Sequence, residues 1–405
     1  MPTKKLTFPN AAGQQLAARL DLPPDDAPSA YALFAHCFTC SKNLTAITNI
    51  SRALTRAGIG VLRFDFTGLG ESEGDFADTN FSSNVGDLVE AAAFLAREYA
   101  APQLLIGHSL GGAAVLHAAA RLPDVTAVVT IGAPCDPAHV RKLLVDADAA
   151  IATEGRAAVT LAGRTFTITQ QFLDDLDTAR MRATIQHLGK ALLICHAPFD
   201  TVVGIENAAH IFAEARHPKS FLSLDQADHL LSNPRDSRYV GATIAAWASR
   251  YVTQAVEEQP SDESDGRVVV RTARGGFFTE IAANGHHLGA DEPTSAGGTN
   301  QGPTPYDLLA AALGACTTIT VQLYADRKGW PLEYAVARLR HQKIHAADCE
   351  ECETKNGKID QIERELEFIG PLDAAQRQRL REIADKCPVH RTLHSEIEIR
   401  TTHKG

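Results

Sequence analysis

The stretch LLIGHSLGG, residues 104–112, constrains the fold of this chain more than any other. An apolar run leads to Gly107, and a helical stretch of small residues, AAVLHAAA, follows directly. The glycines on both sides of Ser109 permit a sharp turn that lifts the serine hydroxyl clear of a sheet. We therefore predict a strand, a tight turn and a helix, with Ser109 at the tip of the turn.

Further apolar runs alternate with amphipathic stretches along the first 250 residues: YALFAH, GVLRFDF, AVVTIGAP, ALLICHAP and KSFLSL. Buried strands that alternate with helices indicate a mostly parallel sheet covered on both faces. Residues 136–189 break the alternation with a charged, helical stretch. We expect this stretch to form a helical cap over the edge of the sheet.

The chain divides at an acidic segment, TQAVEEQPSDESDG, which is typical of a linker. Its position predicts a first domain at residues 1–252, a linker at 253–266 and a second domain at 267–405. The second domain shows strand patterns interrupted by two helices, 305–328 and 373–386. This pattern predicts an α+β fold with a largely antiparallel sheet. A total of 405 residues also favours two cores over one.

Charge and composition exclude some classes of partner. The net charge of −10 argues against nucleic acid, which needs a basic face. No apolar run approaches the ~20 residues that span a bilayer, so we expect no membrane contact. The start, MPTKKLTFPNAAG, lacks the apolar core of a secretory signal, which favours the cytoplasm. There, eight cysteines indicate thiol chemistry or metal binding more than structural disulfides.

A serine hydroxyl is a weak nucleophile that needs a base, and the base needs an orienting acid. After a strand–turn–helix nucleophile, the expected chain order is serine, acid, histidine. The run LLICHAPFD ends at Asp200, and QADHLLS supplies His229, each just past a predicted strand. We therefore predict a triad of Ser109, Asp200 and His229, with Asp225 and Asp228 as alternative acids.

An oxyanion hole needs two backbone N–H donors. Leu110 follows the nucleophile at a helix N-terminus, and Phe38 lies in AHCFTCSKN, the loop after the first buried strand. We predict these two residues as the donors. The alternative for the whole motif is a tight turn with an incidental serine, but the ordered acid, histidine and oxyanion loop favour the catalytic interpretation.

These motifs make residues 1–252 similar to an α/β-hydrolase of the serine esterase or peptidase type. The stretch RFDFTGLGESEG matches a loop typical of that family. The resemblance implies cleavage of a carboxylester, thioester or related acyl bond through an acyl-enzyme. One departure is His36-Cys37, where the family usually has His-Gly. Cys37 and Cys40 form a C-x-x-C pair, which we interpret as small packing residues, with a disulfide as the alternative.

The stretch GPTPYDLLAAALGACTTIT, residues 302–320, predicts a buried helix. Thr304 suits the N-cap and Asp307 can complete a capping box. Cys316 lies about three turns into this helix, beyond the reach of the helix dipole. An apolar environment makes a thiol inert unless a cation offsets it. Cys316 is therefore either a packing residue or a reactive thiol served by a cation from elsewhere.

Residues 267–405 resemble the OsmC/Ohr family of thiol peroxidases, through the stretch around Cys316 and through IADKCPVHRTL around Cys387. The resemblance implies that Cys316 attacks an organic hydroperoxide and becomes a sulfenic acid. Cys387 then forms a disulfide with it, which an external thiol reduces. The resemblance also implies a homodimer formed through this domain.

The family places an arginine from an N-terminal strand and a carboxylate at the reactive thiol. Arg274 is the expected arginine, with Arg271 as the alternative. Tyr306 occupies the carboxylate position, ten residues before Cys316, and the adjacent Asp307 is better explained as a capping residue.

A second cysteine pair lies in LRHQKIHAADCEECET. His345, Cys349 and Cys352 are candidate zinc ligands, because imidazole and thiolate are the ligands that zinc prefers. His341 shares a strand face with His345, but the two lie too far apart to converge easily on one ion. A surface loop with reduced cysteines is the favoured interpretation.

The sequence thus predicts a bifunctional, cofactor-free cytoplasmic protein. A serine hydrolase acts on an acyl substrate, and an OsmC-like domain reduces an organic hydroperoxide with the help of a reducing thiol. The alternative is an esterase whose second domain only dimerises or binds a ligand.

Overall fold

The computed structural model describes residues 3–23, 28–37, 42–143, 147–161, 164–178, 181–252, 267–274, 276–346 and 357–403. The chain forms two compact units: Met1–Arg271 with Glu280–Leu288, and Thr272–Thr279 with Gly289–Gly405. The predicted linker, 253–266, lies outside the described residues.

The first unit is built on an eight-stranded sheet with the order β1-β2-β4-β3-β5-β6-β9-β10. Its strands are β1 (Thr3–Pro9), β2 (Gln15–Asp21), β3 (Ala30–Ala35), β4 (Ile59–Phe64), β5 (Leu104–His108), β6 (Ala127–Ile131), β9 (Ala191–His196) and β10 (Lys219–Ser223). From β4 to β10 the neighbouring strands run parallel, whereas β1–β2 and β2–β4 are antiparallel. The predicted mostly parallel sheet is confirmed.

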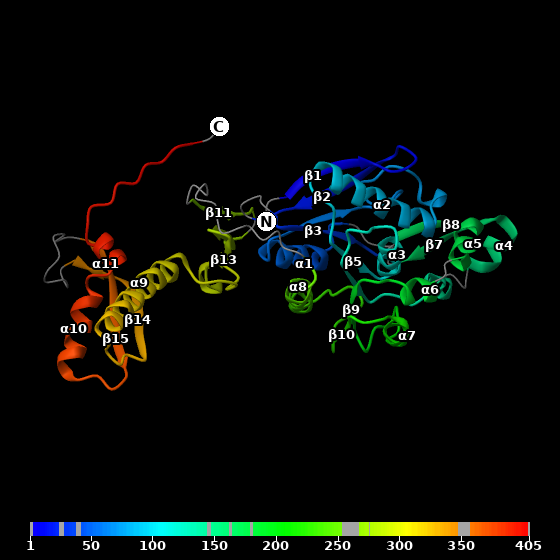
Figure 1. The fold of residues 1–405 in the computed structure, drawn as a ribbon. Helices are drawn as coiled ribbons and strands as arrows, with labels where there is room; N and C mark the ends of the chain where they lie inside the picture. Colours follow the sequence, from blue (N-terminus) through cyan, green and yellow to red (C-terminus); the bar gives the residue numbers. More distant parts are fainter. Residues whose placement is uncertain are drawn as a thin grey trace. The chain divides into compact units, whose positions relative to one another are not determined.

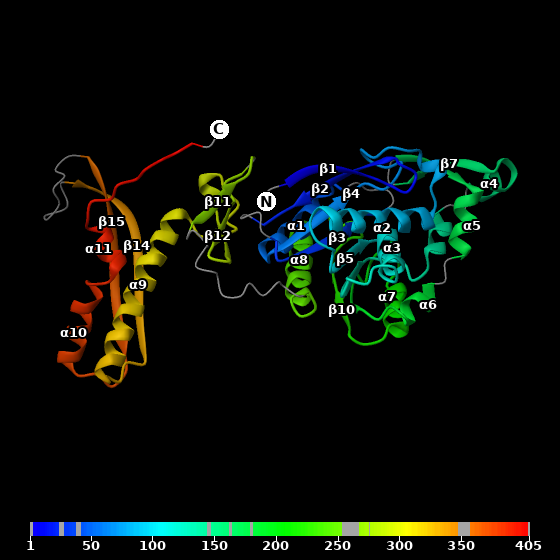
Figure 2. The ribbon, with the colours of Figure 1, turned by 45° about the horizontal axis from the view of Figure 1, so that its top comes forward.

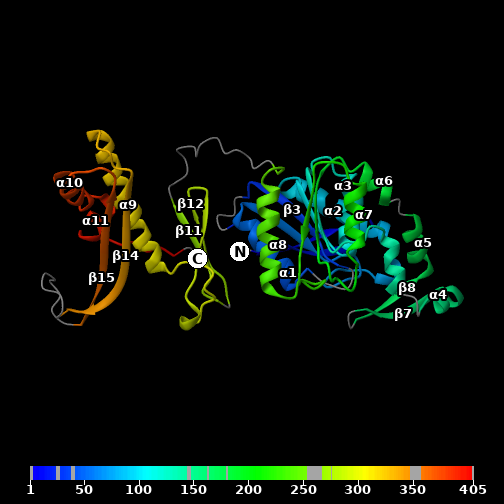
Figure 3. The same ribbon diagram turned by 90° about the horizontal axis from the view of Figure 1, so that it is seen from below.

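Helices cover both faces of this sheet (Figures 1 and 3). On one face, α1 (Thr45–Arg56) packs beside α8 (Pro234–Ala248). The other face carries α2 (Phe81–Glu98), α3 (Leu110–Ala119), α6 (Met181–Gln186) and α7 (Glu206–Glu214). Because both faces are covered, β3, β4, β5, β6 and β9 are buried along their whole length. This is why their sequences are nearly continuous apolar runs.

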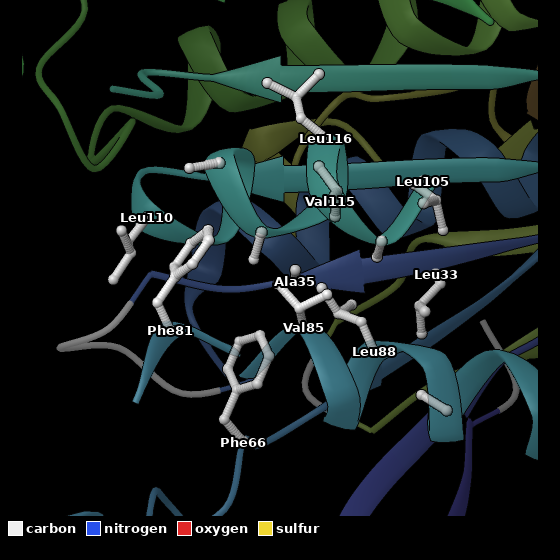
Figure 4. Packing of buried hydrophobic residues seen from close by; sticks show 14 of the residues in the cluster. Leu33, Ala35, Phe66, Phe81, Val85, Leu88, Leu105, Leu110, Val115 and Leu116 are labelled. Carbon is white, nitrogen blue, oxygen red and sulfur yellow. The ribbon is translucent and has the colours of Figure 1, made fainter. Parts of the chain in front are cut away.

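The core between the sheet, α2 and α3 places the end of β5 close to the end of β3 (Figure 4). Leu33 and Leu105 of the sheet face Val85 and Leu88 of α2. A Cβ atom at Gly111 would lie 2.6 Å from the carbonyl oxygens of Ala35 and His36. Only glycine allows α3 to approach β3 this closely, and this approach fixes the turn that carries Ser109.

The cap contains more than the predicted helices. It comprises η2 (Pro137–Leu143), α4 (Asp148–Glu154), the antiparallel hairpin β7 (Arg156–Leu161) and β8 (Arg164–Thr169), α5 (Gln170–Thr178) and α6. The hairpin was not predicted because it lies between two charged helical stretches, although its own sequence has only Arg156 and Arg164 as charged residues. The alternation in RTFTIT, with buried Phe166 and Ile168, is the strand signal. A further short helix, η1 (Phe76–Asp78), precedes α2.

The second unit combines sheets and helices (Figure 2). Its elements are η4 (Thr294–Ala296), α9 (Pro305–Lys328), the antiparallel pair β14 (Tyr334–His345) and β15 (Lys358–Ile369), α10 (Ala374–Ala384) and α11 (Pro388–Leu393). A three-stranded sheet of β11 (Val268–Thr272), β12 (Thr279–Ala283) and β13 (His286–Ala290) is divided between the two units. The bounds of α9 equal those predicted, whereas β13 and α11 were not predicted because each is short.

Helix α9 begins with the predicted capping box between Thr304 and Asp307. Among the described residues, it is the one helix whose length and composition would let it cross a bilayer. The expectation that no apolar run approaches this length was therefore wrong. A core helix of a soluble protein passes the same test, so this is weak evidence for a membrane. The prediction that α9 is buried was only partly right, because Leu309, Ile319 and Leu323 are exposed.

Candidate active sites

Ser109 has the strained backbone expected of a nucleophile turn. Its φ is 56° and its ψ is −127°, a conformation that costs energy for any residue except glycine. Its N–H donates to the carbonyl oxygen of Ile131 at 2.8 Å, which ties the turn to the end of β6. A Cβ at Gly107 would lie 2.3 Å from the carbonyl oxygen of Gly111, so the turn can close only over glycine.

The predicted triad residues lie within hydrogen-bond distance of one another. The Nε2 atom of His229 is 3.0 Å from the Oγ atom of Ser109, and its Nδ1 atom is 2.7 Å from the Oδ2 atom of Asp200. With Nδ1–H donating to the carboxylate, Nε2 is free to accept the serine proton. The arrangement can therefore deprotonate the hydroxyl as it attacks an acyl carbon.

Asp200 is held as a carboxylate. Its Oδ1 atom accepts hydrogen bonds from the backbone N–H groups of Val202 at 2.8 Å and Val203 at 2.9 Å. Burial by itself raises the pKa of Asp200, but the hydrogen bonds from His229 and from these amides outweigh it, and the pKa lies below its ordinary value. Asp200 is therefore charged at neutral pH and can stabilise an imidazolium.

The two alternative acids, Asp225 and Asp228, form hydrogen bonds with residues close to them in sequence instead of with His229. Asp228 accepts a hydrogen bond from the N–H of Ser232 at 2.8 Å, and Asp225 accepts one from the hydroxyl of Ser223 at 3.1 Å. The described contacts of His229 include Asp200 and neither of these residues.

Three residues that the sequence did not indicate support the triad. The Nε2–H of His108 donates to the carbonyl oxygen of His229 at 2.6 Å, and the Nε2–H of His196 donates to that of Val203 at 2.7 Å. Gly132 has a φ of +55°, and a Cβ there would lie 3.3 Å from both Asp200 Oδ2 and His229 Nδ1. The only signal for His108 was its place beside Ser109.

One predicted oxyanion donor can be located. Leu110 is the first residue of α3 and is buried, whereas Phe38 and Cys40 lie outside the described residues. Cys37 is disulfide-bonded, so its interpretation as a mere packing residue was wrong. A two-cysteine spacing alone could not decide between these states.

The residues that flank 38–41 join a buried network of charges. Asp65 accepts a hydrogen bond from the backbone N–H of Lys42 at 2.8 Å and forms an ion pair with its Nζ atom. The Nε2 atom of His36 lies 3.5 Å from the same carboxylate. Burial alone raises the pKa of Asp65, but its bonds with His36, Lys42 and the N–H of Glu71 hold that pKa well below its usual range. The network fixes His36 and Lys42 relative to the end of β4.

The second unit places Cys316 and Cys387 at one short helix. The backbone N–H of Val389 lies 3.4 Å from the Sγ atom of Cys316, and that of His390 lies 3.3 Å from the Sγ atom of Cys387. Consecutive amides of α11 thus point at the two sulfur atoms. Both cysteines are free thiols, with Cys387 fully buried and Cys316 partly exposed.

The cation nearest to this pair along the described contacts is Arg364 of β15. Its Nη1 atom donates to Thr317 Oγ1 at 3.0 Å, and Thr317 lies 3.5 Å from Cys387 Sγ. Arg274 lies in an exposed turn after β11, and no described contact joins it to Cys316. Arg271, the alternative, is part of β11. The role predicted for Arg274 stays a prediction.

Tyr306 lies far from Cys316 on the same helix. Ten residues of α-helix span about 15 Å. Its ring stacks on that of His341, with centroids 3.9 Å apart and an angle of 4° between the planes, and His341 Nε2 bonds to Asp360 at 2.9 Å. The position at which the family has a carboxylate is therefore occupied by an aromatic stack.

No group of three potential metal ligands lies together among the described residues. His345 is exposed at the end of β14, and His341 is engaged by Tyr306 and Asp360. Cys349 and Cys352 lie outside the described residues, so the zinc hypothesis stays untested.

Two family models match separate parts of the chain. Residues 28–165 match the family model described as serine aminopeptidase, S33, and residues 298–402 match that of OsmC-like proteins. In sequence, this chain is 57% identical to the esterase domain of a Rhodothermus marinus protein, which has a crystal structure. The match covers 62% of this chain and 99% of that chain, with a TM-score of 0.53.

Two other relatives are more distant. Est1E from Butyrivibrio proteoclasticus with ferulic acid bound is 18% identical, and the match covers 61% of this chain and 98% of that chain with a TM-score of 0.52, which shows the fold alone. The mitochondrial palmitoyl-protein thioesterase ABHD10 of Rattus norvegicus is 32% identical over 96 residues, which are 24% of this chain and 30% of that protein. The chain thus matches less than a third of the length of that relative.

The chain therefore belongs to the α/β-hydrolase family through its first unit, an esterase-type hydrolase, and it carries an OsmC-like domain in its second.

Proposed function

We propose that the first unit is a serine hydrolase that works through an acyl-enzyme. The observation that carries this proposal is the hydrogen-bonded series Ser109–His229–Asp200. Ser109 attacks the acyl carbon, and His229 takes its proton and later gives it to the leaving group. His229 then takes a proton from a water molecule that attacks the acyl-enzyme, and it returns this proton to Ser109 as the acid product leaves. Leu110 N–H, at the start of α3, is one donor to the oxyanion.

The substrate class is a carboxylester or thioester. An ester substrate agrees with the 57% identical esterase domain, and a thioester with the shorter match to a thioesterase. Assays with a matched pair, an ester and a thioester that carry the same acyl chain, separate the two. A higher kcat/KM for one of them identifies the preferred leaving group.

A fluorophosphonate probe tests the nucleophile. We expect one label per chain, mapped to Ser109 by mass spectrometry, and no label in Ser109→Ala. Asp228→Asn is a matched control for Asp200→Asn, because both change a carboxylate near His229 but only Asp200 contacts the imidazole. Labelling of Ser109→Ala at the original rate contradicts the assignment.

We propose, second, that the OsmC-like domain is a thiol peroxidase with Cys316 as the attacking and Cys387 as the resolving cysteine. This proposal is supported by the two consecutive amides of α11 that point at the two sulfur atoms. An organic hydroperoxide and a reducing thiol are the implied co-substrates. Conversion of the reduced protein into a Cys316–Cys387 disulfide, with stoichiometric loss of hydroperoxide, is the expected result.

The rival proposal treats the second unit as a dimerisation or ligand-binding module. Thiols that stay reduced in the presence of hydroperoxide favour this rival. Cys316→Ser is the control for peroxide consumption, and Ser109→Ala shows whether the two activities are independent.

We also propose that a second copy of the chain covers α9. At 100° per residue, Leu309, Ala312, Ile319 and Leu323 fall within one sector of the helix of about 80°. This outer stripe of α9 is exposed. A continuous apolar stripe of this kind is typical of an interface. Sedimentation should show a dimer, and Ile319→Lys together with Leu323→Lys should give a monomer.

A further inference from the structure

Cys387 lies in a pocket of hydrogen-bond donors. Its sulfur faces the N–H of His390 at 3.3 Å and the hydroxyl oxygen of Thr317 at 3.5 Å. Both Cys387 and Thr317 are fully buried. Cys316, the predicted attacking thiol, has one described donor, the N–H of Val389. The buried thiol therefore has the more complete set of donors.

The hydroxyl of Thr317 is oriented by a cation. Its Oγ1 atom accepts an N–H of Arg364 at 3.0 Å, which uses a lone pair of the oxygen. The hydroxyl hydrogen is then free to point at the sulfur of Cys387. A hydroxyl that accepts from a guanidinium is a stronger donor than an isolated one, because bonds in such a series polarise one another.

Arg364 is held in one position by further bonds. The same Nη1 atom donates to the carbonyl oxygen of Ala384 at 3.2 Å, and Nη2 forms an ion pair with Asp385. Arg364 side-chain exposure is only 12%. Because Ala384 and Asp385 already fix the planar guanidinium, it presents Nη1 to Thr317 with little further loss of conformational entropy.

His390 does not provide a positive charge beside Cys387 at neutral pH. Burial lowers the pKa of His390, and the nearby charge of Arg364 lowers it further. The other charged groups that adjoin the pair in sequence, Lys386 and Arg391, are exposed.

We propose that Arg364 and Thr317 are positioning residues for the resolving step, in which they orient the Cys387 sulfur and stabilise the negative charge that it carries as it attacks. This inference rests on the proposed peroxidase function. The Cys387 sulfur attacks the sulfur of the Cys316 sulfenic acid, so that the S–S bond forms and the S–O bond breaks. The hydroxide that leaves takes up the proton that Cys387 gave up, and water is released. Arg364 acts here through Thr317 and touches no reacting atom.

A single-turnover experiment separates this step from the first oxidation. The reduced full-length protein is mixed with one equivalent of cumene hydroperoxide in the presence of dimedone, which traps sulfenic acids. Mass spectrometry then measures the Cys316–dimedone adduct and the Cys316–Cys387 disulfide over time. The unaltered protein should give mostly disulfide.

Thr317→Val removes the hydroxyl and keeps the shape of the side chain. We expect this variant to consume hydroperoxide at the original rate but to form the disulfide roughly tenfold or more slowly, so that the dimedone adduct accumulates. This magnitude corresponds to the loss of a hydrogen bond to a charged group. Thr317→Ser, which keeps the hydroxyl, should restore the disulfide. Arg364→Met should behave like Thr317→Val, and Arg340→Met, which alters an exposed arginine of β14, should behave like the unaltered protein.

The outcomes distinguish the two proposals. An original rate of disulfide formation in Thr317→Val, or no rescue by Thr317→Ser, overturns the role of the hydroxyl while the peroxidase stands. Absence of both adduct and disulfide in the unaltered protein overturns the peroxidase and the positioning role together.

Discussion

The Nε2 atom of His108 lies 2.6 Å from the backbone carbonyl oxygen of His229, so the residue that precedes the candidate nucleophile holds the loop of the candidate base. Burial, together with the smaller effect of the neighbouring His229, lowers the pKa of His108 to about 3. The ring is therefore neutral at any working pH, and its one N–H is committed to this bond. Two segments that are far apart in sequence are thus joined directly at the site.

We predict that His108→Phe lowers kcat by about 10- to 100-fold, since a lost positioning hydrogen bond is worth roughly 1–3 kcal/mol. KM should change little because His108 is buried, with 3% of its surface exposed. His108→Asn keeps a donor and should recover part of the rate. Steady-state kinetics on an ester substrate checks this, and equal losses in both variants would contradict it.

Gly132 supports a second prediction. In Gly132→Ala the new Cβ meets Asp200 Oδ2 and His229 Nδ1 at 3.3 Å, so the carboxylate or the imidazole must shift. Small displacements of catalytic groups cost about 10-fold or more in rate. Gly13→Ala is the matched control, because Gly13 also has a positive φ but no atom within 4 Å of the added Cβ. Both variants should lose stability, and only Gly132→Ala should lose kcat.

The buried ion pair of Lys42 and Asp65 gives a prediction about stability and pH. Asp65→Asn removes the buried partner of the Lys42 ammonium, leaves it with the exposed carboxylate of Glu71, and should cost about 3–5 kcal/mol at pH 7. A carboxylate with a depressed pKa in the folded state contributes stability above about pH 3.9, its value in the unfolded chain. That contribution is lost as the pH falls through the lower folded value. The free energy of unfolding of Asp65→Asn should therefore depend less on pH below 4.

Glu71→Gln is the control for this measurement. Glu71 pairs with the same Lys42 Nζ atom but has a side chain that is 63% exposed. Its loss should change the free energy of unfolding far less than Asp65→Asn, as measured by urea denaturation. Equal effects would show that burial does not determine the strength of these pairs.

Replacing Tyr306 by a carboxylate should not increase the rate at which the protein consumes hydroperoxide. Tyr306→Glu restores the carboxylate that the family has at this position, but about 15 Å of continuous helix separates it from Cys316 in the same chain. We expect no increase in the rate of hydroperoxide loss. Thermal stability should fall because the stack on His341 is removed. A tenfold faster reaction would show that the carboxylate reaches the thiol by another route.

Much of the first unit could be predicted because its signals are local. Ser109 and Asp200 each follow a buried strand, His229 follows the half-buried edge strand β10, and parallel strands bring their carboxyl ends to one edge of a sheet. A pattern of single residues was therefore enough to place three side chains that the structure brings together. The supporting bond from His108 to a backbone carbonyl carries no residue pattern and could not be predicted.

The second unit shows the opposite case. The caps of α9 were readable because capping is a contact between residues three positions apart. The role of Arg364 could not be predicted, because its place at the thiols depends on how β14 pairs with β15 and on which face of that pair meets α9. Such tertiary pairing leaves little trace in a single sequence.

The pairing of β14 and β15 also decides the sign of the charge near the thiols. Arg364 pairs with Leu339, whose side chain approaches α9 near Gly314, while Glu363 and Glu365 on either side of it point outward. A shift of the register by one residue turns every side chain of a strand to the opposite face. Such a shift would withdraw the guanidinium and bring a carboxylate toward Thr317. A shift in register would therefore reverse the sign of the charge beside the thiol pair without altering either cysteine.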